Sequence, residues 1–162
     1  MKLFILFNST ISMSIVAAHA EKIISKLVYQ NTHTPSQAIS GWMNFHRFVS
    51  LASAGNNKFA MANIFKELTN LSNGSYIVES SNDENTEEYV AIGILLPSIV
   101  YDIAPKLFQD NDHSFILKHG ETTSSIERMV GGRTAETASF PVNDVKLVQL
   151  LQKYFTCKNK SL

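Results

Sequence analysis

The sequence predicts an α/β fold: a small mixed sheet of about four strands, with helices packed on its faces and a helical extension at the C-terminus. Short apolar runs suited to buried strands alternate with longer segments whose apolar residues recur every three or four positions, as on one face of a helix. Through residue 108 the predicted order is strand, helix, strand, helix, strand, strand, helix. Strands separated by helices favour parallel crossover connections.

The first elements are a strand and a long helix. Residues 3–7 form a continuous apolar run typical of a buried strand, and Asn8-Ser9-Thr10 predicts a turn that caps the next helix. That helix is expected to end before Pro35, because proline disfavours a helical conformation in the residue before it. Its predicted apolar stripe consists of Ile11, Ile15, Ile23 and Leu27, with Ala20, Ile24 and Val28 beside them.

The middle of the chain supplies three more strands and two more helices. Residues 47–53 predict the second strand, and residues 58–71 form the clearest amphipathic helix. A third strand is expected over residues 75–79, followed by an acidic loop over residues 80–88. Three segments complete this part: a central apolar strand at 89–96, Pro97-Ser98, and a helix over 99–108.

The remainder is expected to be mainly helical. Residues 114–118 predict a short strand, and the capping-box pattern Ser124-Ser125-Ile126-Glu127 predicts a helical turn through Val130 that Gly131-Gly132 ends. Asn143 or Asp144 is expected to cap a final helix. The expected organisation is an α/β domain over residues 1–110 and a C-terminal extension over residues 111–162 that packs on the same domain.

Composition argues against several function classes, although a local basic patch stays open. Lys and Arg total 14 and so do Asp and Glu, so the chain lacks the positive charge that nucleic-acid binding usually requires. The single cysteine, Cys157, allows neither an intrachain disulfide nor a cysteine-based zinc cluster, and no metal or cofactor is expected. No apolar run approaches the roughly 18–20 residues of a membrane-spanning helix.

The first twenty residues have two incompatible interpretations. Lys2, the apolar stretch that follows and Ala18-His19-Ala20 before Glu21 resemble a signal peptide, which would make the protein secreted or periplasmic after cleavage at Ala20. The alternative is the strand and helix described above, in a cytoplasmic protein. Five polar residues interrupt the apolar stretch and favour the second interpretation: Asn8, Ser9, Thr10, Ser12 and Ser14.

The candidate catalytic residues are His19, Asp83 and Thr86. A histidine at the edge of an apolar helix stripe has the chemistry of a general base, and a nearby Asp–Thr pair would assist it. Each residue also has a structural interpretation: a histidine whose hydrogen bond is satisfied by a backbone carbonyl, and an acidic loop that faces water.

The layout resembles the type 2 peptidyl-tRNA hydrolase superfamily over roughly residues 1–108. The resemblance rests on two short motifs after the N-terminal strand: Ala17-Ala18-His19-Ala20 in the first helix, and Ala91-Ile92-Gly93 followed by Pro97 and Asp102. It implies a shared α/β fold. It also implies lysines in the first loop and an Asp-Ala-Gly-x-Thr segment in members that cleave peptidyl-tRNA, whereas this chain has no lysine at residues 8–14 and reads Asn82-Asp83-Glu84-Asn85-Thr86 later.

We therefore expect a module that binds a small ligand or a protein, on a fold similar to that of these hydrolases, with homodimer formation left open. One alternative is a secreted or periplasmic effector, inhibitor or immunity-type binding protein. The other is a divergent hydrolase of peptidyl-tRNA or another ester; if the chain is an enzyme, hydrolysis is the expected reaction.

Overall fold

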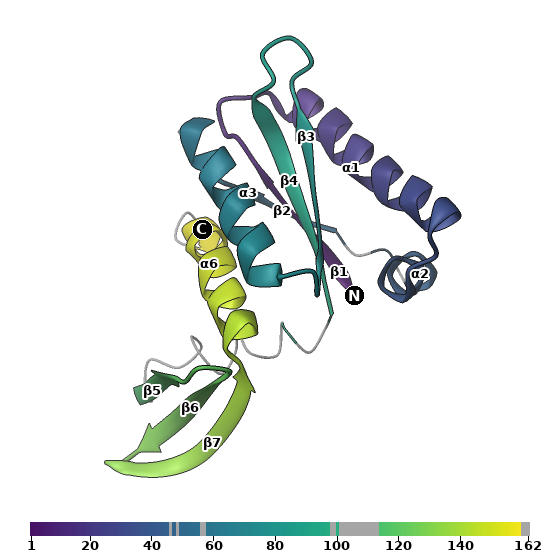
Figure 1. The fold of residues 1–162 in the computed structure, drawn as a ribbon. Helices are drawn as coiled ribbons and strands as arrows, with labels where there is room; N and C mark the ends of the chain where they lie inside the picture. Colours follow the sequence, from purple (N-terminus) through teal and green to yellow (C-terminus); the bar gives the residue numbers. More distant parts are fainter. Residues whose placement is uncertain (46, 48, 56–57, 98–99, 101–113, 160–162) are drawn as a thin grey trace. The chain divides into compact units, whose positions relative to one another are not determined.

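A computed structural model describes residues 1–159, apart from positions 46, 48, 56–57, 98–99 and 101–113 (Figure 1). The chain forms two compact units, one of Met1–Pro97 with Tyr154–Leu162 and the other of Ser98–Lys153. The predicted α/β fold with a C-terminal helix is confirmed. The assignment of residues 1–110 and 111–162 to a domain and an extension packed on it stays a prediction.

The first unit contains a four-stranded mixed sheet with the strand order β2-β1-β4-β3. Its strands are β1 (Lys2–Phe7), β2 (Val49–Ser53), β3 (Ile77–Asn82) and β4 (Tyr89–Leu96). β1 is parallel to β2 and antiparallel to β4, which is also antiparallel to β3. The apolar runs of β1 and β4 are explained by this order, because both strands lie inside the sheet and are almost entirely buried.

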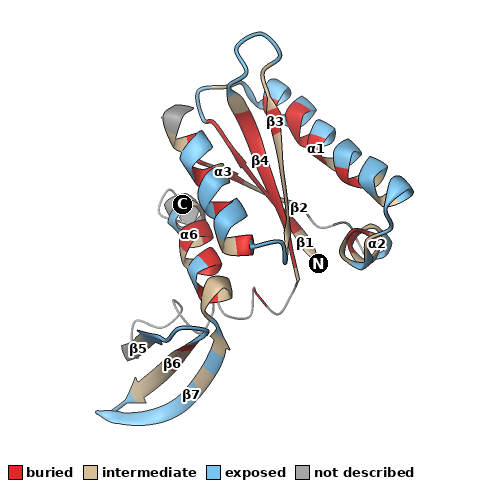
Figure 2. Ribbon diagram, in the orientation of Figure 1, coloured by how far each residue is buried: buried red, intermediate tan, exposed pale blue. Residues whose placement is uncertain are grey.

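Helices cover both faces of this sheet (Figure 1). α1 (Met13–His33) and α2 (Gln37–Asn44) provide the crossover between the parallel strands β1 and β2. Their buried residues share one core cluster with the sheet: Leu3, Ile5, Ala20, Ile23, Leu27, Ile39, Trp42, Ala91 and Leu95. α3 (Lys58–Ser72) lies on the other side of the sheet and buries Met61, Ile64 and Leu68 (Figure 2). The unit is a three-layer α/β/α sandwich.

Gly93, in the middle of β4, allows α1 to approach the sheet closely. A Cβ atom at this position would lie 3.0 Å from Cγ2 of Ile23 and 3.4 Å from Cδ1 of Leu3. Because buried carbon atoms pack best at about 3.5–4.0 Å, a larger residue would push the helix away from the strand.

A β-bulge interrupts the pairing of β3 with β4. The register shifts between Ser81 and Asn82, so Ser81 pairs with Ala91 while Asn82 pairs with Tyr89. The alternation of side chains therefore changes at this point, and the Tyr89 ring stacks on Phe65 of α3 with a centroid distance of 5.3 Å. Ser81, before the bulge, keeps its side chain on the α1 face, where it bonds His19.

The second unit contains an antiparallel three-stranded sheet of β5 (Ser114–His119), β6 (Thr123–Val130) and β7 (Arg133–Pro141). The predicted helical turn from Ser124 to Val130 is wrong. A capping-box pattern is local, whereas pairing with β5 and β7 on both sides supports a strand here. Gly131 and Gly132 form the β6–β7 turn with φ values of 59° and 76°, as a type I′ turn requires.

The remaining predictions differ in detail. The final helix is confirmed as α6 (Val142–Asn159), while the short α2 was not predicted. Ile15 is 49% exposed, and Val16 is buried in its place. β3 runs to Asn82, so residues 80–82 belong to the sheet and not to a loop. The predicted helix over 99–108 falls almost wholly outside the described residues.

Residues 1–20 contribute β1 and the first part of α1 to this sandwich. β1 pairs on both sides and supplies Leu3 and Ile5 to the core. In the described part of the chain, no helix combines the length and apolarity needed to span a membrane.

Candidate functional site

A polar seam joins α1 to the edge strand β3 and the loop after it. The strands β3 and β4 and the loop between them form a hairpin. Four side chains of α1 contact this hairpin, and because they are three or four residues apart they lie on one face of the helix. Their contacts are His19 with Ser81, Lys22 with Glu84, Lys26 with the carbonyl oxygen of Ser80, and Gln30 with Glu79. Beyond the apolar contact of Ile77 with the core, α1 is thus joined to β3 through polar side chains.

His19 and Ser81 form the buried end of this seam. Nδ1 of His19 lies 2.7 Å from Oγ of Ser81, and the two residues are 7% and 2% exposed. A buried hydroxyl and imidazole usually need such a partner, because each would otherwise lose its hydrogen bonds to water. The sequence predicts a backbone carbonyl as the partner of a buried His19, whereas the partner of Nδ1 is a side-chain hydroxyl, a group with nucleophilic chemistry.

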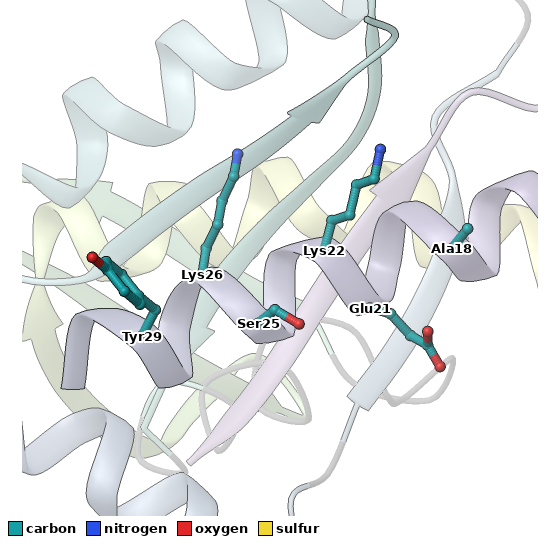
Figure 3. Close-up of a pocket in the computed structure, with 6 residues that line it drawn as sticks. All are labelled: Ala18, Glu21, Lys22, Ser25, Lys26 and Tyr29. Atoms are coloured by element: carbon teal, nitrogen blue, oxygen red, sulfur yellow. The ribbon is translucent and has the colours of Figure 1, made fainter. Parts of the chain in front are cut away.

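The two lysines form the open side of the seam. Figure 3 shows Lys22 and Lys26 extending from the same side of α1, while the Glu21 carboxylate points away from them. Lys22 Nζ lies 3.4 Å from Oε1 of Glu84, and both side chains are well exposed. A hollow of about 590 Å³ along α1 is lined by Ala18, Glu21, Lys22, Ser25, Lys26 and Tyr29.

The loop between β3 and β4 is organised by Asp83. Its Oδ1 accepts hydrogen bonds from the backbone N–H groups of Asn85, at 2.8 Å, and Thr86, at 3.1 Å. The Thr86 hydroxyl accepts a longer bond of 3.4 Å from the N–H of Glu88. Asp83 and Thr86 therefore stabilise the turn, and Thr86 is exposed. The interpretation of this segment as an acidic loop that faces water agrees with these contacts.

Together, α1 and the β3–β4 hairpin line a second space that is open to solvent, which we call the polar hollow. It has a volume of about 580 Å³ and is lined by Lys22, Lys26, Ser81, Asn82, Asp83, Glu84, Glu87 and Tyr89. Two ammonium groups thus face three carboxylates, and the Ser81 end adjoins His19.

Burial and charge shift two pKa values at this site. Burial lowers the pKa of His19 below its ordinary 6.5, and Lys22 lowers it further, while Asp83 and Glu84 oppose these effects. The backbone N–H groups of Asn85 and Thr86 hold the pKa of Asp83 below its ordinary 3.8. At neutral pH the site therefore contains a neutral imidazole beside ionised Asp83.

Of the three predicted catalytic residues, His19 and Asp83 come close enough to interact electrostatically. Thr86 lies in the same loop, where its hydroxyl is engaged with the backbone. Ser81 was missed, because the polar residues 80–82 were interpreted as loop. Continuing the period of two from Ile77 through Glu79 would have placed Ser81 on the α1 face.

No group of three or more potential metal ligands occurs among the residues that the structure describes. Comparison with protein-family models gives no match for this chain, and comparison with curated proteins gives none either.

Proposed function

We propose that this chain is a small-ligand-binding protein with a fold similar to that of type 2 peptidyl-tRNA hydrolases, and that the polar hollow is its binding site. One observation carries the proposal: α1 and the β3–β4 hairpin, far apart in the sequence, line a single hollow with charged side chains. Its volume of about 580 Å³ lies within the range of roughly 300–1,000 Å³ typical of small-molecule sites.

Support for the fold comes from the two motifs that carry the resemblance. Ala20 of the first motif and Ala91 of the second belong to the same buried cluster. Gly93 of the second motif lies under Ile23, one turn after His19 and Ala20. The two motifs therefore pack against one another, as a shared fold would require.

The charges of the polar hollow favour a ligand that carries a positive charge. Three carboxylates against two lysines leave an excess of one negative charge. The Lys22–Glu84 pair is exposed, and exposed pairs contribute only about 0–1 kcal/mol, so a ligand can displace it at little cost. An oxygen atom of the same ligand would find Lys22 or Lys26 on the opposite wall.

The test is an NMR titration of the ¹⁵N-labelled chain with choline at millimolar concentration. Its uncharged isostere, 3,3-dimethylbutan-1-ol, is the matched control ligand. We expect saturable shifts for the amides of Lys22, Lys26 and residues 81–87 with choline, and much weaker shifts with the isostere. Glu87→Gln should weaken choline binding about two- to fivefold, because it removes one exposed charge pair.

Glu21→Gln is the matched control variant, because Glu21 loses the same charge on the same unit but does not line the polar hollow. It should bind choline as the unaltered chain does. The proposal is wrong if choline produces no saturable shifts, or if the isostere produces equal ones.

A further inference from the structure

We propose that Ser81 and His19 act as a nucleophile and its general base, and that they hydrolyse small esters of cationic alcohols bound in the polar hollow. This proposal rests on the binding function above, because the ester must occupy the same hollow.

The geometry of the pair suits nucleophilic catalysis. The separation of 2.7 Å between Ser81 Oγ and His19 Nδ1 is within the range of about 2.6–3.2 Å over which a base takes a proton from a nucleophile. Ser81 also forms part of the wall of the polar hollow, immediately before the β-bulge. Bulges are frequent beside active sites, where they redirect side chains.

A second Ser–His pair offers a comparison, because neither of its residues lines the polar hollow. His119 Nδ1 lies 2.6 Å from Oγ of Ser124, across β5 and β6. Ser124 is almost fully buried, as Ser81 is, but unlike Ser81 it does not line the polar hollow. This pair therefore provides an internal control for the chemistry proposed at Ser81.

Charged groups of both signs surround the proposed reacting pair. Burial and Lys22 lower the pKa of His19 and keep it neutral as a base, while Asp83 and Glu84 partly offset this effect and favour the imidazolium that forms when it accepts a proton. The Lys26 ammonium donates to the carbonyl oxygen of Ser80, next to the proposed nucleophile. A cation in this position stabilises negative charge that develops on the ester oxygen.

The reaction proceeds in two steps. Ser81 Oγ attacks the ester carbonyl carbon while His19 Nδ1 takes the hydroxyl proton; the C–O bond to the alcohol then breaks, and His19 returns the proton to the departing alcohol. In the second step, water attacks the acyl–Ser81 ester with His19 again as the base. The acid is released, Ser81 recovers its proton, and no oxidant or metal is consumed.

The first experiment labels the chain with a fluorophosphonate, which serine nucleophiles attack with loss of fluoride, and locates the label by mass spectrometry. We expect one label per chain, on Ser81 and not on Ser124. Ser81→Ala should abolish labelling, and Ser124→Ala should leave it unchanged. Ser81→Cys keeps a nucleophile of similar size at this position. Alkylation of that cysteine, mapped by mass spectrometry, would show that a reagent reaches the side chain at position 81 even if Ser81→Ala folds poorly.

The second experiment measures hydrolysis of acetylthiocholine and of its neutral isostere, 3,3-dimethylbutyl thioacetate. We expect preference for the cationic ester, and a loss of about 10²–10⁴-fold in kcat/KM for His19→Gln, as for removal of a general base. In the unaltered chain kcat/KM should fall in acid as His19 becomes protonated, and His19→Gln should lose this dependence.

The outcomes separate this proposal from the proposed binding function. Choline-induced NMR shifts without labelling at Ser81 and without ester hydrolysis above the Ser81→Ala level would overturn the catalytic proposal and leave the binding function standing. Absence of choline binding would overturn both. Labelling confined to Ser81, with hydrolysis that depends on His19, would support both.

Discussion

Replacing Gly93 by alanine should destabilise the first unit by overpacking the contact between α1 and β4. The added Cβ would lie 3.0 Å from Cγ2 of Ile23 and 3.4 Å from Cδ1 of Leu3, against an optimum of about 3.5–4.0 Å. Overpacking of a buried core costs about 1–3 kcal/mol, and replacing glycine in a strand recovers about 0.5–1 kcal/mol. The difference is about 0–2.5 kcal/mol, and because the closest approach is 3.0 Å we expect a net decrease in the free energy of unfolding of about 1–2 kcal/mol.

Urea denaturation followed by Trp42 fluorescence measures this effect. Trp42 is the single tryptophan of the chain and belongs to the same buried cluster as Ile23. With a denaturant dependence of about 2 kcal/mol per molar urea, a loss of about 1–2 kcal/mol lowers the midpoint by about 0.5–1 M for Gly93→Ala.

The matched control is Gly41→Ala in α2. There the added Cβ would meet only Met1 Cγ, at 3.8 Å, which is an ordinary contact. Since glycine costs about 0.8–1.0 kcal/mol relative to alanine inside a helix, this variant should be more stable than the unaltered chain. In the Ile23→Ala background, the cost of Gly93→Ala should shrink because the closest atom is gone. A Gly93→Ala variant as stable as Gly41→Ala would refute the close-packing argument.

Three further predictions concern the N-terminus and the pH dependence of stability. Deleting residues 1–20 removes the interior strand β1, so a chain beginning at Glu21 should show no cooperative transition in Trp42 fluorescence; a sharp transition would contradict this. The lowered pKa of His19 means that the unfolded chain binds more protons, so stability present above about pH 6.5 should fall as the pH drops through the folded-state pKa. His19→Gln should remove that part of the decline in urea midpoints. The lowered pKa of Asp83 has the same effect at lower pH: it contributes stability that is present above about pH 3.8 and lost on further acidification. Asp83→Asn should therefore reduce the fall of the urea midpoint in this acidic range.

Much of the first unit follows from local patterns. The apolar run at residues 89–96 coincides with β4, and the predicted helix at 58–71 differs from α3 by one residue at its end. Period and length suffice for such elements, because a buried strand or an amphipathic helix carries its pattern within its own sequence.

The errors arise where partners distant in sequence decide the conformation. Ser124-Ser125-Ile126-Glu127 matches a helix-capping pattern, but β5 and β7 pair with this segment on both sides. Ile15 fits the apolar repeat of α1, yet the sheet covers the side of the helix that carries Val16, and Ile15 faces outward. Neither partner is visible in a short window of sequence.

The candidate site divides in the same way. The sequence by itself identified His19 and Asp83 as residues of suitable chemistry, because side-chain type is a local property. Only the tertiary structure decided that Ser81 joins His19 at 2.7 Å, since that contact depends on β3 lying at the sheet edge beneath α1. The physical reason is that the side-chain period, two residues in a strand and 3.6 in a helix, assigns each residue to one face of its own element. The order of the strands in the sheet then determines which other residues pack against that face.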